Sequence, residues 1–220
     1  MAYRLRRNLS FCISANRTVF LDLDTNRYFG LPQNWDRDFR RFIAEPGGLE
    51  DRFPVIEALL ERGLLVSDSA ADGCLTSPSI APPTAILENF GNKASVGSCV
   101  RAITAQLSSA GRLRIGSLSA VVERIRARKM IAPPWDGKLP AVERIAASFE
   151  RTSLLLSPAD RCLPRSVAFH ALCMREDCYP DLVIGVRVNP FTAHCWVQHD
   201  AYVLNDMVER VRLFTPILVI

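Results

Sequence analysis

The stretch from Ser157 to Asp206 constrains the fold more than any other part of the chain. It contains a cysteine at the expected start of a helix, followed by a histidine and a carboxylate on the strands that come next. This order is how proteins build a thiol nucleophile with a general base and a group that orients the base. The sequence therefore predicts Cys162 as nucleophile, His194 as base and Asp206 as the orienting acid.

A helix is expected to begin beside Cys162. Asp160 is the predicted N-cap residue, and Pro164 falls in the first turn, where its missing N–H costs little. Apolar residues then recur at three- and four-residue spacing, and the helix must end before Tyr179-Pro180. Cys162 would lie at the positive end of the helix dipole, which favours the thiolate and lowers the pKa of the thiol.

Two strands are expected to follow this helix. Residues 182–188 alternate and are rich in β-branched side chains, and Asn189-Pro190 then ends the run. In the next run His194 and Trp196 point to the same face, because side chains alternate along a strand. We therefore expect Trp196 to shield the histidine from water.

The hairpin loop decides which residue lies opposite the histidine. With a three-residue loop, Gln198 pairs with Tyr202 and His194 faces Asp206. Directly opposed side chains have Cβ atoms about 4.5–5.5 Å apart, within reach of an imidazole–carboxylate hydrogen bond. A two-residue loop would instead set His194 opposite Asn205. We favour Asp206 as the orienting residue, with Asn205 as the alternative.

Composition and charge narrow the class of protein. The 220 residues are 49% hydrophobic and 23% charged, which is ordinary for a globular chain of one large or two small domains. The net charge of +4 is mildly basic, and the arginines of residues 112–129 lack interleaved aromatic residues. These arginines indicate a solvated helix face, so we expect no nucleic-acid partner. No run of eighteen apolar residues occurs, so we expect no membrane span.

The cysteines indicate a reducing compartment. There are seven, an odd number, and residues 1–7 lack the apolar run that follows the charged start of a signal peptide. We therefore expect a cytoplasmic protein with free thiols. Cys173 and Cys178 lie near His170, but no second ligand pair with zinc-finger spacing accompanies them, so we expect neither a metal nor another cofactor.

The chain is expected to form two domains joined by a linker. Residues 1–67 contain short apolar strands and two helices, residues 68–84 are rich in the residues of an extended connection, and residues 85–220 begin with a helical region. The strands and helices expected in the first domain are 9–13, 18–23, 27–31, 35–44 and 53–62.

Roughly the last sixty residues resemble a known family. The matching segments are Cys162–Ser166, Val183–Arg187, Pro190–Val197 and Val203–Asp206. They are similar to the leader peptidases of lasso-peptide biosynthesis, within the transglutaminase-like (papain-like) cysteine protease superfamily. The resemblance implies an α+β protease domain in which the cysteine attacks the scissile carbonyl as a thiolate. Cys195 departs from the family, where a small residue such as alanine is more familiar.

Residues 1–67 resemble the leader-recognition element of ribosomal peptide pathways, a small winged-helix-like module. Val19–Asp22 and Tyr28–Leu31 fit its strand pattern. The resemblance implies that the leader docks as an added strand along Arg27–Leu31 and beside Val55–Arg62. The residues expected in this groove, for which core packing is the alternative, are Tyr28, Phe29, Leu31, Ile56 and Leu60.

The resemblance therefore predicts a leader peptidase that binds a ribosomally made precursor peptide and cleaves the leader from the core. It also implies a partner, the ATP-dependent, asparagine-synthetase-like lasso cyclase. No phosphate-binding loop is visible, so the sequence does not support ATP binding by this chain. Two rivals stay open: a transferase that passes the thioacyl group to an amine, and a non-catalytic adaptor that delivers the precursor to the cyclase.

Overall fold

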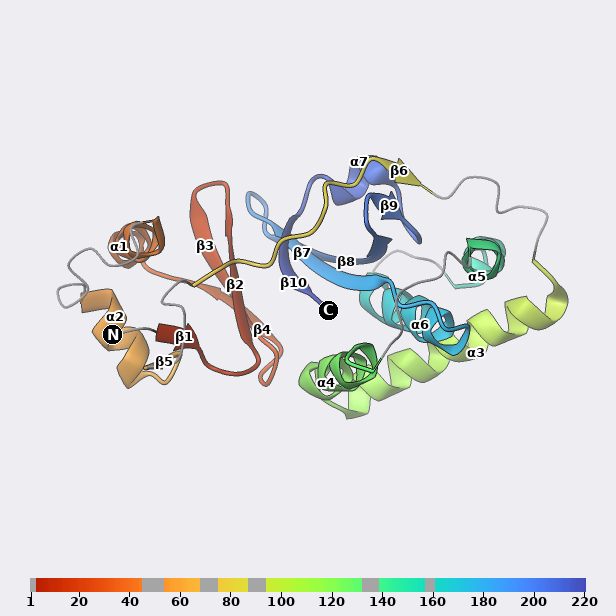
Figure 1. Ribbon diagram of the computed structural model, residues 1–220, viewed down its shortest axis with the longest axis horizontal. Helices are drawn as coiled ribbons and strands as arrows, with labels where there is room; N and C mark the ends of the chain where they lie inside the picture. The colour runs from red at the N-terminus through yellow and green to blue at the C-terminus, as the bar shows by residue number, and fades with distance from the viewer. Residues whose placement is uncertain (1–2, 45–53, 68–74, 87–93, 132–138, 157–160) are drawn as a thin grey trace. The chain divides into compact units, whose positions relative to one another are not determined.

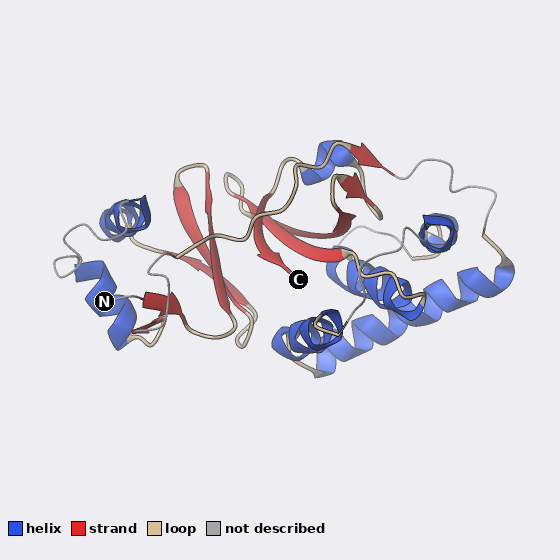
Figure 2. Ribbon diagram, viewed as in Figure 1, coloured by secondary structure: helices blue, strands red, loops and turns tan. Residues whose placement is uncertain are grey.

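The computed structural model describes residues 3–44, 54–67, 75–86, 94–131, 139–156 and 161–220 (Figure 1; Figure 2). Helices and sheets both occur, which confirms the α+β class expected from the sequence. The chain divides into two compact units, residues 1–78 and 79–220. No helix in the described ranges is both long and apolar enough to cross a bilayer.

The described residues of the first unit form two small antiparallel sheets and two helices (Figure 1). One sheet has the strand order β2-β3-β4, and the other pairs β1 with β5. The elements are β1 (Tyr3–Leu5), β2 (Leu9–Ser14), β3 (Arg17–Asp22), β4 (Arg27–Gly30), α1 (Gln33–Ala44), α2 (Pro54–Glu61) and β5 (Leu65–Ser67). Ala15 and Asn16 both have positive φ in the turn between β2 and β3, which suits a tight hairpin.

Aromatic rings form the core of the first unit. Phe20 is fully buried and stacks on Phe29 with ring centroids 5.1 Å apart. Phe11 and Phe39 pack on the same ring, at 6.0 and 5.4 Å. Aromatic pairs at these separations stabilise a core beyond the contribution of the apolar area that they bury. This core holds β4 at one edge of the three-stranded sheet, with β2 at the other edge.

The second unit has a five-stranded sheet with the order β10-β7-β8-β9-β6, in which the β6–β9 pair is parallel and the other pairs are antiparallel. Its strands are β6 (Ala85–Ile86), β7 (Asp181–Arg187), β8 (Thr192–His199), β9 (Tyr202–Val203) and β10 (Thr215–Val219). Its helices are α3 (Val96–Ile115), α4 (Leu118–Lys129), α5 (Leu139–Thr152), α6 (Cys162–Arg175) and α7 (Val208–Val211). Helix α6 packs against α3, α5 and β8, so it is the helix that joins the helical part to the sheet.

The hairpin of β8 and β9 differs from the favoured prediction. His199 pairs with Tyr202, so the loop has two residues and not three. Asp200, in this turn, has a φ of 48°, a left-handed conformation that Asp tolerates well. The predicted pairing of Gln198 with Tyr202 is therefore wrong, since Gln198 pairs with Val203.

The expected linker at 68–84 is described only in part. Residues 68–74 lie outside the described residues, and residues 75–84 contain no helix or strand. The following strand β6 then pairs with β9, and the N–H of Thr84 donates to the carbonyl of Ala201 at 2.9 Å. The end of the connection is thus bound to the sheet that carries β8.

Candidate active site

The N-terminus of α6 holds the thiol. The helix begins at Cys162, and Arg161 occupies the N-cap position without a side-chain capping hydrogen bond. Asp160, the predicted N-cap residue, lies outside the described residues. Pro164 falls in the first turn, where it loses no intrahelical bond. Cys162 therefore lies where the helix dipole favours a negative charge.

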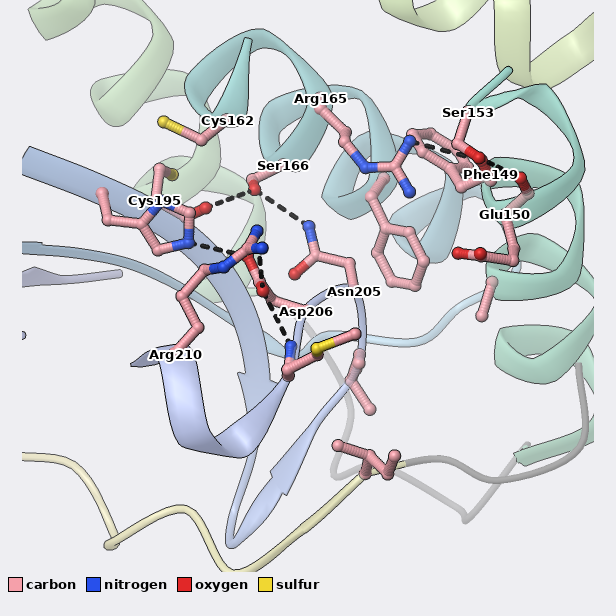
Figure 3. Close-up of a pocket in the computed structure, with 16 residues that line it drawn as sticks. Phe149, Glu150, Ser153, Cys162, Arg165, Ser166, Cys195, Asn205, Asp206 and Arg210 are labelled. Carbon is pink, nitrogen blue, oxygen red and sulfur yellow. Dashed lines mark hydrogen bonds and ion pairs between the residues drawn. The ribbon is translucent and has the colours of Figure 1, made fainter. Parts of the chain in front are cut away.

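The structure brings Cys162, His194 and Asp206 to one pocket with a volume of about 400 Å³ (Figure 3). Cys162 comes from α6, His194 from β8, and Asp206 from the bend between β9 and α7. Three separate segments thus supply the three residues that the sequence selected.

The ring of His194 is held by Asp206. Its Nε2 lies 2.7 Å from Oδ2 of Asp206, and both side chains are 11% exposed. The N–H of Met207 donates to Oδ1 of the same carboxylate at 2.7 Å, and Nη1 of Arg210 lies 3.5 Å away. The observed register, continued along the strands, would set His194 opposite Met207, but the chain bends after Leu204, and so the carboxylate of Asp206 reaches the ring. Asp206 is therefore the partner of His194, as predicted, although the register of β8 and β9 differs from the predicted one.

With Nε2 on the carboxylate, Nδ1 is the ring atom left for the thiol. Burial alone would raise the pKa of Cys162, but a hydrogen bond to His194 and the positive charge of that ring lower it below the ordinary value. Burial lowers the pKa of His194, but hydrogen bonds to Asp206 and Cys162, with their charges, raise it to about 9. These opposite shifts favour a thiolate–imidazolium pair near neutral pH.

Two backbone N–H groups also contact the sulfur. They belong to Cys195 on β8 and to Leu163, the second residue of α6, and both hydrogen bonds lower the pKa of Cys162. Donors in these positions stabilise negative charge at the sulfur and beside it. The Cys195 N–H could not be predicted from the sequence, because a backbone group carries no residue signature.

Two aromatic rings fix the orientation of His194. Trp196 lies on the same face with ring centroids 6.2 Å apart, as the strand alternation predicted, and Phe214 lies at 5.0 Å. Gly185 is the cross-strand neighbour of His194 on β7. A Cβ at Gly185 would lie 2.8 Å from the indole of Trp196 and 2.9 Å from Cβ of Phe214. The glycine therefore provides the space in which these two rings pack.

One wall of the pocket carries charged residues that are not among the predicted catalytic residues. Arg165 is 9% exposed, donates to the carbonyl of Phe149 at 3.2 Å and stacks over that ring at 5.2 Å. Burial lowers its pKa, whereas Glu150 and Asp206 oppose that change. Figure 3 shows Arg165 and Glu150 on the side of the pocket formed by α5 and α6. The sequence signal that could have placed Arg165 at the pocket is its position three residues after Cys162 on the same helix.

The residues predicted to bind a leader all lie in the first unit. Tyr28 and Phe29 are half-buried on β4, and Leu60 is half-buried on α2. Leu31 and Ile56 are buried in the core of that unit, at 7% and 2% exposed. Of the five, only Tyr28, Phe29 and Leu60 therefore offer partly accessible side chains.

The possible zinc ligands are buried, and neither the thiol of Cys173 nor the imidazole of His170 is charged near neutral pH. Burial raises the pKa of Cys173 and lowers that of His170 to about 4, and Nε2 of His170 lies 3.1 Å from the carbonyl of Pro180. Across the described ranges, no three His, Cys, Asp or Glu side chains are grouped to hold a metal ion. All six cysteines in those ranges are free thiols.

Comparison with known families gives one match. The family described as the transglutaminase-like superfamily matches residues 105–219, which is just over half the chain. The matched stretch includes Cys162, His194 and Asp206. No curated protein and no solved structure matches the chain.

We predict that Cys162 reacts with iodoacetamide at a lower pH than a free thiol. The thiolate persists down to the lowered pKa of Cys162, whereas an unperturbed thiol has a pKa of about 8.5. In His194→Ala the burial remains without its compensating partner, so the midpoint should rise and alkylation at pH 7 should slow by about tenfold or more. Mass spectrometry of the Cys162 peptide measures the rate, with N-acetylcysteine as reference. An unchanged midpoint in His194→Ala would contradict the ion pair.

We further predict that Gly185→Ala disturbs the orientation of His194 indirectly, through the two aromatic rings that pack on it. The new methyl group overpacks Trp196 and Phe214, which should cost about 1–3 kcal/mol of stability and slow alkylation of Cys162. Gly111→Ala in α3 is the matched control, because a Cβ there meets nothing within 4 Å. Chemical denaturation and the alkylation assay measure both effects. Equal behaviour of the two variants would show that the space at Gly185 is not needed.

Proposed function

The chain belongs to the transglutaminase-like superfamily, and from that premise we propose that it is a cysteine peptidase that removes the leader from a lasso-peptide precursor. The observation that carries the proposal is the hydrogen-bonded set of Cys162, His194 and Asp206 in the pocket, which we call the relay. Nε2 of His194 hydrogen-bonds to Asp206, and the thiol of Cys162 hydrogen-bonds to the same ring. A thiolate beside an imidazolium is the resting state of a nucleophile that attacks carbonyl carbon.

The cleavage proceeds in two steps. The sulfur of Cys162 attacks the scissile carbonyl carbon, and the proton on His194 passes to the nitrogen of the leaving amine as the C–N bond breaks. Water then attacks the thioacyl carbon, giving its proton to His194, and the C–S bond breaks to release a carboxylate. Asp206 fixes the ring tautomer and supports the imidazolium in both steps.

The oxyanion requires N–H donors beside the sulfur. The first is the backbone N–H of Cys162 itself at the start of α6, as the helix geometry favours. The N–H of Cys195 already contacts the sulfur and supplies the second. Both are backbone groups on regular elements, so they need no side-chain rearrangement during the reaction.

The leader is proposed to bind the first unit, with residues 1–67 as the recognition domain. Strand β4 forms an edge of the three-stranded sheet, and an extended peptide can add to such an edge through backbone hydrogen bonds. Tyr28 and Phe29 on β4 and Leu60 on α2 are the partly accessible side chains that support this surface. The asparagine-synthetase-like, ATP-dependent cyclase is the proposed partner that receives the freed core.

The transferase rival differs only in the second step. An amine in place of water would attack the same thioacyl carbon, and the relay serves both reactions equally. The pocket has both apolar and charged walls, and the charged residues Glu150, Arg165 and Arg210 are compatible with access by water. The product mass separates the two, because hydrolysis leaves a carboxylate and transfer leaves an amide.

We predict that Cys162→Ala abolishes release of the leader while leader affinity stays within about twofold of wild type. The variant removes the nucleophile and nothing from the recognition surface. Mass analysis of a precursor peptide measures cleavage, and fluorescence anisotropy of a labelled leader measures binding. Cys99→Ala, a partly buried cysteine on α3, serves as control and should cleave normally. Normal maturation by Cys162→Ala would identify the chain as an adaptor.

We also predict that Leu60→Asp weakens leader binding by about tenfold or more, because a carboxylate replaces a partly accessible apolar side chain of the proposed recognition surface. Alkylation of Cys162 should be unaffected in this variant. Ile13→Asp on β2, at the opposite edge of the same sheet, is the matched control and should bind normally. The recognition surface is misplaced if the two substitutions weaken binding equally.

A further inference from the structure

Strand β8 has an incomplete edge beside the active site. On one side β7 pairs with it along its length, whereas on the other β9 pairs only with Gln198 and His199. One further backbone bond joins the N–H of Leu204 to the carbonyl of Val197 at 2.9 Å, and side chains then take the place of a strand. The N–H of Val197 donates to Oδ1 of Asn205 at 2.8 Å, and the carbonyl of Cys195 accepts from Oγ of Ser166 at 2.8 Å.

The two side chains form one directed network. Because Oδ1 of Asn205 accepts a backbone N–H, the amide orientation is fixed and Nδ2 must donate. Nδ2 lies 2.9 Å from Oγ of Ser166, so that hydroxyl accepts from the amide and sends its own proton to the carbonyl of Cys195. Figure 3 shows Ser166 between Cys195 and Asn205, with both hydrogen bonds dashed.

Each member of the network is next to a residue of the relay. Ser166 lies one helical turn after Cys162 on α6, Cys195 follows His194 on β8, and Asn205 precedes Asp206 in the bend. The network therefore ties together the three segments that supply the relay. A buried hydroxyl such as Ser166, 1% exposed, needs some partner in any fold. These partners are the backbone and side-chain groups adjoining the reacting groups.

We propose that Asn205 and Ser166 are positioning residues that keep α6, β8 and the Asp206 bend in register and hold the Cys195 N–H against the sulfur of Cys162. Neither side chain acts on the substrate. Their effect passes through the Cys195 N–H, whose hydrogen bond stabilises the thiolate. The inference gives Asn205 a separate task from Asp206, because Asp206 accepts the hydrogen bond of the His194 ring whereas Asn205 accepts from the N–H of Val197. It rests on the proposed function only for the identity of the peptide substrate.

The test compares Ser166→Ala and Asn205→Ala with Ser166→Thr, which keeps a hydroxyl. Each full-length variant is alkylated with iodoacetamide across pH, and its kcat and KM are measured on a precursor peptide. Both alanine variants should move the alkylation midpoint of Cys162 upward by about one unit, equal to about tenfold slower alkylation at pH 6. They should lower kcat with little change in KM, and Ser166→Thr should restore both properties.

Ser148→Ala is the control for simple loss of stability. Ser148 is also 1% exposed, and its hydroxyl donates to a helix carbonyl at 2.7 Å, but that carbonyl belongs to Arg144 on α5. It should lower the melting temperature and leave the alkylation profile unmoved. A wild-type profile in the alanine variants, or an equal shift in Ser148→Ala, overturns the proposal. If Ser166→Ala does not fold, Asn205→Ala decides, because Asn205 is only half-buried.

The alkylation arm needs no peptide substrate. A wild-type protein that leaves the precursor intact would end the leader-peptidase assignment, while the predicted shift in alkylation would still support the positioning role. The two proposals can therefore fail separately.

Discussion

The hydrogen bond between His194 and Asp206 is the interaction on which the chemistry of this protein depends. Burial lowers the pKa of the imidazole and raises that of the carboxyl group, so neither charge would be favoured at this site alone. Each overcomes its burial through the other, together with Cys162 for the ring and with the Met207 N–H and the charge of Arg210 for the carboxylate. Removing one member thus leaves a buried charge without compensation, which is why such groups act as a unit.

This dependence explains the shape of the sheet around β8. A longer strand paired with β8 would occupy the edge at which the N-terminus of α6 places Cys162 beside His194. The strand β9 is only two residues long, and the chain bends away after Leu204. The edge left behind is covered by side chains and by the start of α6, so its backbone groups stay bonded although no strand pairs there. A conventional hairpin would have closed the site.

The parts of this arrangement that the sequence predicted are the periodic ones. The apolar spacing after Pro164 predicted α6 with Cys162 at its start, and alternation placed His194 and Trp196 on one face. The predicted β8–β9 register was wrong because a change of one residue in loop length changes every pairing of the two strands. The loop length depends on the turn conformation of Asp200, which no periodic sequence pattern indicates. Asp206 reaches the ring through an irregular bend, so the correct partner was chosen from an incorrect register. Asn205 and Ser166 stood in motifs already quoted, but their hydrogen bonds join segments far apart in sequence and leave no local pattern.

The two neighbouring thiols of the pocket show how environment, not residue type, separates a nucleophile from a packing residue. Cys195 is 3% exposed, and burial together with the nearby charge of Cys162 raises its pKa, so it remains a neutral thiol. Cys162 is half-buried, which also raises its pKa, yet the ring of His194 and two backbone N–H groups lower the pKa below the ordinary value. Only one of the two sulfurs therefore carries charge beside the imidazolium. A cysteine in place of a smaller residue at position 195 is compatible with the relay because its side chain stays uncharged while its N–H contacts the sulfur that reacts.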